Sequence, residues 1–364
     1  MPFTPFFERD TTYLSLNSAS TLLLNVMQNL SFSLPFSRRL SLLLTMLLCN
    51  GFALFAQKSA PIATDDTYQV GVNATLVVNA GNGLLANDSD ANGNNTMSVR
   101  TTAVTAPTSG VVTLNADGSF TYVPNTGYVG PDSFTYQVCD DGTPSVLVSR
   151  FDFDTATITD ASIGPDATSV NSNAAQIGCG IHFPSGAGGS TGFDIVVPNA
   201  TGIFDFTSFT ISFEYQDQES TADIVTAGNF RIYHITGNEM GIRATVINST
   251  TGLPEEFVIT LGSFVSGNNP YTVGYNEITG EVTYTSNGTT TTFAFAPPNS
   301  PLDTSLATDV IIGRFMDGSG SSLPSLCSME FVDDSVLCDT GDVSVSVISN
   351  VITNRNITYR VRPN

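Results

Sequence analysis

Short runs in which apolar and polar residues alternate dominate the chain from Pro61 onward. Residues that favour turns (Gly, Asn, Asp and Pro) separate these runs at spacings of about 8–12 residues, which is typical of β-sandwiches. No helical period is visible in this part of the chain. The pattern therefore predicts an all-β protein.

Between residues 61 and 145 we expect five strands, at 68–71, 75–79, 111–115, 118–124 and 133–138. The last two carry aromatic residues at every second position, which places one row of rings on a buried face. These residues are Phe120, Tyr122, Phe134 and Tyr136. The region is predicted to form a β-sandwich.

Residues 148–334 contain a second run of strands. We expect ten, at 151–154, 192–197, 209–215, 230–234, 240–246, 257–261, 271–275, 281–285, 291–295 and 310–314. Ten strands in under 190 residues, without a helical period, predict a jelly roll of two packed sheets.

The N-terminal region has a different composition. Residues 40–55 form a nearly uncharged apolar run after Arg38 and Arg39, and small residues end it at Ala56. These are the parts of a secretion signal, so we expect residues 1–56 to be a leader, with Met27 as an alternative translation start. The run of 16 residues is short for a membrane span of about 20, which makes an N-terminal membrane anchor the less favoured alternative.

Acidic residues outnumber basic ones by 33 to 12, and from residue 57 onward by 31 to 9. Such a surface repels phosphate backbones and anionic lipid headgroups, which argues against nucleic-acid and peripheral membrane partners. It suits a protein that meets divalent cations outside a cell. With 41% hydrophobic and only 12% charged residues, the chain can still build packed cores.

Cysteine usage also indicates an exported protein. Cys49 lies in the leader, and four cysteines remain after it: Cys139, Cys179, Cys327 and Cys338. An even number in an exported chain predicts two disulfides. No CxxC spacing occurs, so a zinc site is not expected.

Four motifs follow one another in the first strand-rich region. They are Ala-Thr-Asp-Asp-Thr-Tyr (63–68), Gly-Leu-Leu-Ala-Asn-Asp-Ser-Asp (83–90), Asp-Gly-Ser-Phe-Thr-Tyr-Val-Pro (117–124) and Gly-Pro-Asp-Ser-Phe-Thr-Tyr (130–136). In this order they resemble the bacterial cadherin-like repeat of large surface adhesins. The resemblance implies an extracellular Ig/cadherin-like β-sandwich, often associated with calcium, that serves as a spacer or adhesion unit.

A candidate calcium site lies within these motifs. Asp88, Asp90 and Asn92 present side-chain oxygens at alternate positions before Gly93, as at the start of an EF-hand loop. No bidentate Glu follows at the twelfth loop position, so an ordinary Asn/Asp/Gly turn is an equal alternative. We expect Ca²⁺ as a structural cofactor.

The second region resembles the laminin-G-like, concanavalin-A-like jelly rolls of bacterial surface proteins. The segments that carry this resemblance are 151–154, 160–166, 210–214, 271–276, 280–284 and 312–314. It implies that the regions of Asp160 and Glu330 approach each other and hold a structural calcium, the alternative being two solvated acids. Unlike many relatives, this chain has no Trp.

The tripeptide Ser-Val-Leu occurs on both sides of the second region, at 145–147 and 335–337. If one copy of this tripeptide and the region between the copies are removed, the remaining sequence is a Cys-bearing hairpin followed by an alternating strand. Cadherin-like repeats usually end in this way. The resemblance therefore implies a jelly roll inserted in the last hairpin of a discontinuous sandwich, an insertion that costs little loop entropy.

The boundaries that follow are 61–145 plus 335–348 for the sandwich and 148–334 for the jelly roll. Residues 349–364 form a tail or an incomplete further repeat. The nested arrangement implies a disulfide between Cys139 and Cys338, with Cα atoms about 4.4–6.8 Å apart, and one between Cys179 and Cys327 within the jelly roll. The alternative is three consecutive domains.

No catalytic constellation is expected. The segment most similar to the Glu-x-Asp-x-Glu strand of some glycosidases contains Glu214, Asp217 and Glu219. Because side chains alternate along a strand, Glu214 would point to the opposite face from the other two. The two histidines, His182 and His234, have no Gly-x-Ser-x-Gly nucleophile motif beside them.

Together these features predict an exported, non-enzymatic adhesion protein of the cell surface, with the jelly roll as recognition module on a cadherin-like spacer. Its partner would be an extracellular protein or glycan. The main alternative is a carbohydrate-binding lectin, which the absence of Trp as a sugar platform disfavours. A polysaccharide hydrolase is a third and less favoured alternative.

Overall fold

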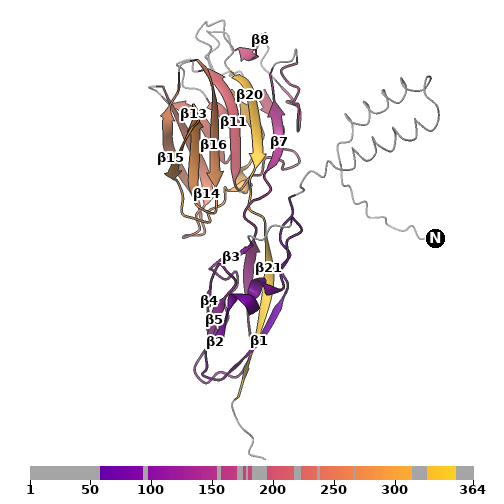
Figure 1. Ribbon diagram of the computed structural model, residues 1–364, viewed down its shortest axis with the longest axis vertical. Helices are drawn as coiled ribbons and strands as arrows, with labels where there is room; N and C mark the ends of the chain where they lie inside the picture. The colour runs from indigo at the N-terminus through magenta and orange to yellow at the C-terminus, as the bar shows by residue number, and fades with distance from the viewer. Residues whose placement is uncertain are drawn as a thin grey trace, which may run out of the picture. The chain divides into compact units, whose positions relative to one another are not determined.

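The computed structural model describes residues 58–92, 97–153, 157–169, 175–177, 179–182, 195–216, 223–235, 238–265, 267–313 and 326–349 (Figure 1). Strands dominate this part of the chain, and the three short 3-10 turns are η1 (Ala80–Asn82), η2 (Leu84–Ala86) and η3 (Thr304–Leu306). The predicted all-β class is confirmed. None of the described helical segments has the length and apolar character needed to cross a membrane. The predicted leader and residues 350–364 lie outside the described residues.

A small sandwich is built from two sheets. One has the order β1 (Asp66–Gly71), β21 (Cys338–Ile348), β6 (Gly130–Cys139) and β3 (Ser98–Val99); the other has the order β2 (Leu76–Val78), β5 (Phe120–Pro124) and β4 (Gly110–Leu114). The two predicted aromatic rows line its core, because Phe120, Tyr122, Phe134 and Tyr136 are all at most 1% exposed.

The last strand of the small sandwich lies far from the others in sequence. β21 pairs in parallel with β1 and antiparallel with β6, so that Cys338 lies directly opposite Cys139. Val343, Val345 and Val347 alternate into the core that residues 70–138 share. The small sandwich is therefore completed by a strand that follows the large sandwich in the chain.

The large sandwich has a six-stranded and an eight-stranded sheet. The six-stranded sheet has the order β10 (Ile195–Val197), β19 (Val310–Ile312), β12 (Asp223–Thr226), β13 (Phe230–Ile235), β14 (Glu239–Ile247) and β15 (Pro254–Ser263). The other has the order β18 (Thr289–Ala294), β17 (Glu281–Ser286), β16 (Asn268–Asn276), β11 (Phe209–Gln216), β20 (Leu326–Asp333), β9 (Gly180–His182) and β8 (Ala175–Ile177), with β7 (Val146–Phe151) beside β20. Side chains from both sheets form one hydrophobic core.

Several strands differ from the predicted ones. The strand expected at 151–154 overlaps β7 only at Phe151. Phe153 has a positive φ of 43°, which leaves the extended conformation. The alternation pattern also missed β12, since all four of its residues are buried and none marks an outer face. The laminin-G-like assignment of the large sandwich stays a prediction.

Candidate functional site

The junction between the sandwiches is closed by a disulfide. Cys139 and Cys338 are bonded, with Cα atoms 4.1 Å apart, slightly closer than expected. Cys179 and Cys327 form the second disulfide, with a Cα separation of 5.1 Å. Just beyond the first bond, the fully buried Asp140 accepts hydrogen bonds from the backbone N–H groups of Gly142 and Leu337, both at 2.9 Å. Burial raises the pKa of this carboxyl.

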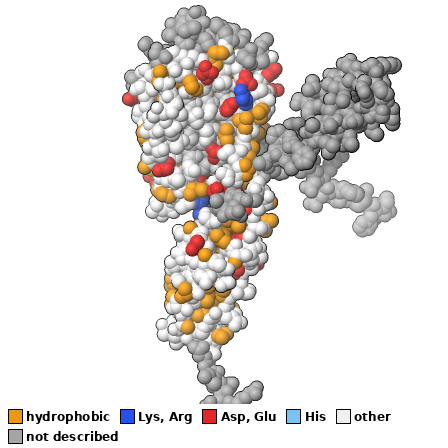
Figure 2. All heavy atoms as spheres, viewed as in Figure 1, with side chains coloured by type: hydrophobic (Ala, Val, Ile, Leu, Met, Phe, Trp, Pro, Cys, Tyr) orange, Lys and Arg blue, Asp and Glu red, His pale blue; other side chains and the backbone are white. Residues whose placement is uncertain are grey.

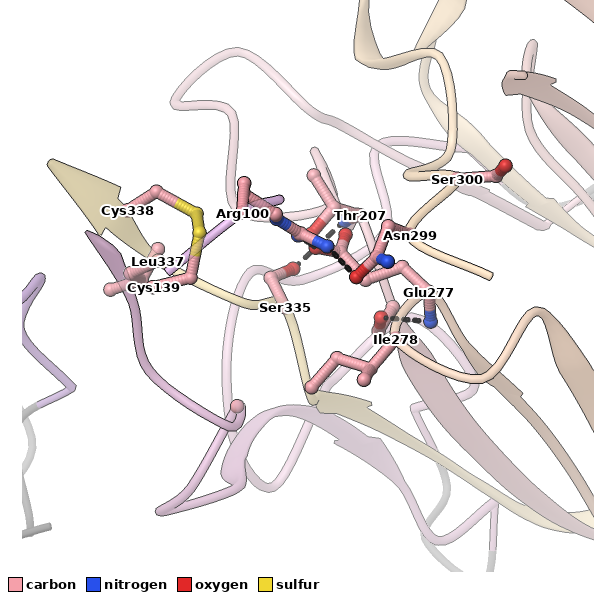
Figure 3. Close-up of polar contacts among 12 residues, drawn as sticks. Arg100, Cys139, Thr207, Glu277, Ile278, Asn299, Ser300, Ser335, Leu337 and Cys338 are labelled. Carbon is pink, nitrogen blue, oxygen red and sulfur yellow. Dashed lines mark hydrogen bonds and ion pairs between the residues drawn. A yellow bond between two sulfur atoms is a disulfide. The ribbon is translucent and has the colours of Figure 1, made fainter. Parts of the chain in front are cut away.

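The two connecting segments lie against each other beyond Asp140. Gly142 has a φ of +82°, and a Cβ atom there would lie 2.5 Å from the carbonyl oxygen of Asp334. Only glycine combines this conformation with so close an approach. Ser335 Oγ accepts a hydrogen bond from the Thr207 N–H at 2.8 Å, which attaches the returning segment to the large sandwich (Figure 3).

Two ion pairs join the sandwiches. Arg100, which follows β3, contacts Glu277 at 3.1 Å and also bonds Asn299 (Figure 3). Glu277 is only 2% exposed, and this burial raises its pKa while Arg100 acts in the opposite direction. Lys58, whose side chain is 6% exposed, lies 3.8 Å from Asp333. Each pair takes its base from the small sandwich and its acid from the large one.

The predicted calcium ligands of the small sandwich each have protein partners. Asp88 accepts hydrogen bonds from the Thr64 N–H at 2.7 Å and from the Tyr136 hydroxyl at 2.9 and 3.0 Å. Asp90 Oδ1 accepts the Asn92 N–H at 2.8 Å, and Asn92 Oδ1 accepts from the backbone and hydroxyl of Ser59. Asp88 is therefore part of a partly buried hydrogen bond with Tyr136, whose ring lies in the core.

Two carboxyl oxygens in this region lack a donor. Oδ2 of Asp66 and Oδ2 of Asp90 are buried without a hydrogen-bond partner among the described residues. Burial, and next the neighbouring Asp88, raise the pKa of Asp66 to about 6. Asp66 was not among the predicted ligands, although the Asp-Asp pair of the first motif was a visible signal. These two oxygens have the acceptor capacity that a cation would need.

The two acids of the second predicted calcium site have different partners. Glu330 in β20 binds Arg150 at 2.9 Å, and Arg150 also binds Asp152 at 2.7 Å. Asp160 is exposed in a turn, where Thr159 Oγ1 lies 3.3 Å from it. Across the described ranges, no group of three or more His, Cys, Asp or Glu side chains is arranged to hold a metal ion. Calcium stays a prediction, and Glu330 already has a cationic partner.

The residues considered for catalysis are also held by structural contacts. Glu214 accepts a hydrogen bond from Asn268 at 2.7 Å. His234 is 4% exposed and stacks on Phe264 with centroids 4.8 Å apart. Asp217, Glu219 and the side chain of His182 lie outside the described residues.

One part of the chain matches a known protein family. Residues 58–150 match the family model of the bacterial cadherin-like domain. The match extends past Cys139 into β7, which belongs to the large sandwich, whereas the strand that pairs with β6 is β21. We therefore call the small sandwich the cadherin-like sandwich. No curated protein matches the chain.

The chain also has low similarity to several solved structures. The CBM40 domain of the Ruminococcus gnavus IT-sialidase, bound to α2,3-sialyllactose, is 16% identical over 40% of this chain and 87% of its own, with a TM-score of 0.28. The binding domain of botulinum neurotoxin DC in complex with SialylT is 14% identical over 54% and 49%, with a TM-score of 0.35. Trypanosoma rangeli sialidase is 13% identical over 63% and 41%, with a TM-score of 0.34. Scores this low support no functional argument, so the proposals below rest on this chain's own residues.

Proposed function

We propose that the chain is an extracellular, non-enzymatic adhesion protein in which the large sandwich is the recognition head and the cadherin-like sandwich its support. Two disulfides fit an oxidising compartment outside the cell. The excess of acidic over basic residues disfavours nucleic-acid partners.

The observation that carries this proposal is the double connection of the head. Both ends of the large sandwich leave from paired strand ends, at Cys139 of β6 and Cys338 of β21, which a disulfide joins. An adhesion protein transmits force between its ligand and its support. Here two chain segments connect the head to its support, next to the disulfide, and they share such a force. A single flexible linker would carry the whole force and would leave the head free to turn.

The non-enzymatic part of the proposal is supported by the contacts of the candidate catalytic residues. Glu214 is engaged by Asn268, and His234 is buried against a phenylalanine ring. A general acid or base must reach a substrate proton. The buried His234 does not present its ring to solvent, and Glu214, although partly exposed, is already bonded to Asn268. A glycan is our preferred ligand class, because the large sandwich carries a pair of partly exposed arginines, Arg231 and Arg243.

Adhesion of beads coated with the secreted chain tests the proposal. The surfaces are a glycan array and a panel of extracellular proteins. The matched control lacks residues 146–335, which joins Ser145 to Val336 and restores a continuous hairpin between β6 and β21. We expect adhesion by the whole chain and none by the control. Equal adhesion by both, or turnover of a bound polysaccharide, would contradict the proposal.

A further inference from the structure

Two of the five basic side chains in the described part of the chain meet on the outer face of the six-stranded sheet. Arg231 in β13 and Arg243 in β14 are directly opposite in the antiparallel register. Their side chains are 36% and 49% exposed. Like charges in directly opposite positions destabilise a strand pair, so the sheet itself does not benefit from this placement.

A carboxylate holds each guanidinium by the same edge. The buried Asp223 pairs with Nε and Nη2 of Arg231. Glu256 contacts Nε and Nη2 of Arg243 at 2.6 and 2.5 Å. A guanidinium carries five N–H donors in a planar fork, so the opposite edge of each group keeps donors to offer. Among the described residues no acceptor is bonded to that edge.

An aromatic ring orients one of the two arginines. The guanidinium carbon of Arg231 lies 4.5 Å from the ring centroid of Tyr233, a cation–π contact. Gly241 lies directly opposite Tyr233. A Cβ atom at Gly241 would lie 3.2 Å from Tyr233 Cζ and 2.7 Å from Ile235 Cδ1. Glycine weakens the interior of a strand and often marks a site where another group approaches the backbone closely. At Gly241 that group is the ring of Tyr233.

We infer that this arginine–tyrosine face binds the carboxylate of a single acidic sugar at the end of an otherwise neutral oligosaccharide. Adjacent guanidinium forks match the planar geometry of a carboxylate. Val258, 57% exposed and opposite Arg243, adds an apolar contact beside them. The inference rests on the proposed function, because it names the ligand class of the recognition head.

The net charge of the chain restricts the ligand further. With 31 acids against 9 bases from residue 57 onward, the chain repels polyanions such as polyuronates. A ligand with one terminal carboxylate brings its charge only to the arginine pair. The head should therefore distinguish a singly acidic glycan both from its neutral analogue and from a polyanion.

Binding measurements on the whole secreted chain test this inference. The probes are 3′-sialyllactose, its methyl ester, lactose, a trisaccharide ending in glucuronic acid, and polygalacturonate. We expect the acid-terminated probes to bind and the ester, lactose and polygalacturonate to bind at least about tenfold more weakly. Arg231→Ala and Arg243→Ala should each weaken binding by about tenfold or more. Binding by only one of the two acidic sugars would identify the sugar, and binding by both would show that the carboxylate alone is recognised.

Arg150→Ala is the matched control, since Arg150 is 42% exposed and ion-paired but lies in the other sheet. It should leave binding unchanged. Arg231→Lys keeps the charge and the fold without the planar fork, and should still weaken binding. Equal binding of lactose and 3′-sialyllactose, or full binding by both alanine variants, overturns the inference and leaves the adhesion proposal standing. Absence of all glycan binding also overturns it, while the bead assay with the 146–335 deletion decides the proposed function separately.

Discussion

The two sandwiches differ in the bases that are available to their carboxylates. In the cadherin-like sandwich, hydroxyl and backbone N–H groups hold them: Tyr136 donates to Asp88, and Tyr122 donates to Asp132 at 2.7 Å. In the large sandwich, Arg150, Arg231 and Arg243 form ion pairs within the sandwich itself. Figure 2 shows one face of the molecule, on which acidic side chains outnumber basic ones.

The basic residues of the cadherin-like sandwich explain this difference. Between residues 58 and 142 only Lys58 and Arg100 are basic. Both pair with acids of the large sandwich, Asp333 and Glu277. The smaller unit therefore has no base left for its own carboxyls, and its stability should respond to pH and to cations. The stability of the large sandwich should fall when a base of the cadherin-like sandwich, Lys58 or Arg100, is removed.

The largest expected effect comes from the junction disulfide. Cys139→Ser with Cys338→Ser should lower the unfolding free energy of the cadherin-like sandwich by about 3 kcal/mol, because the cross-link no longer restricts the unfolded chain. Denaturant unfolding followed by near-ultraviolet circular dichroism measures this. Cys179→Ser with Cys327→Ser is the comparison, and should act on the large sandwich. If both double variants shift a single common transition equally, the two sandwiches unfold as one unit and the distinction between them fails.

Removing Arg100 should destabilise the sandwich to which it does not belong. Arg100→Ala leaves Glu277 buried without its cation, which should cost the large sandwich about 2–3 kcal/mol at pH 7.5. Because burial raises the pKa of Glu277, the folded state binds a proton more readily than the unfolded state. The loss should therefore shrink as the pH falls towards 5.

A second substitution checks this cause. Glu277→Gln, added to Arg100→Ala, should recover part of the stability, since no buried charge remains. Arg150→Ala, which breaks a more exposed pair, should cost at most about 0.5 kcal/mol. An Arg100→Ala variant as stable as the wild type at pH 7.5 would show that the junction pair contributes nothing.

Asp66 should make the cadherin-like sandwich less stable at neutral pH. Its pKa is raised from 3.8 to about 6, so stability gained on protonation is present at low pH and lost as the pH rises through this window. Asp66→Asn should then stabilise this sandwich by about 1 kcal/mol at pH 7.5, after allowance for solvent screening, and by nothing at pH 4. Thermal unfolding in the presence of a chelator gives both values. A gain that does not change with pH would assign the effect to something other than this carboxyl.

Calcium should have an effect of about the same size as that of Asp66. Extracellular sites with a Kd near 10⁻⁴–10⁻³ M would add roughly 1 kcal/mol at millimolar calcium, a rise of a few degrees in Tm. Asp90→Ala should abolish the calcium-dependent part, since Asp90 Oδ2 has no donor in the described chain. Asp88→Ala is a poor test because it also removes the partner of Tyr136. Identical melting curves in calcium and in chelator, at one ionic strength, would leave these acids without a cation-binding role.

Local alternation was enough to predict most of the strands and much of the core of both sandwiches. A period of two assigns each side chain to a face without knowledge of its neighbours, so Phe120, Tyr122, Phe134 and Tyr136 could be placed in a core from the sequence. The same rule failed for β12, where both faces are buried and no alternation exists. The cadherin-like motifs could be recognised as a set, but not the tyrosine–carboxylate hydrogen bonds that they form.

The chemistry of the junction and of the head depended on contacts between distant positions. Arg100 and Glu277 are 177 residues apart in the chain, and neither is unusual in its local sequence. Arg231 and Arg243 meet because the β13–β14 register places them opposite each other, and a shift of one residue would turn one of them towards the core. Oδ2 of Asp66 and Oδ2 of Asp90 lack a donor among the described residues because packing removes these two oxygens from water. Strand register and desolvation arise from the packing of the whole chain, so the order of residues alone did not show them.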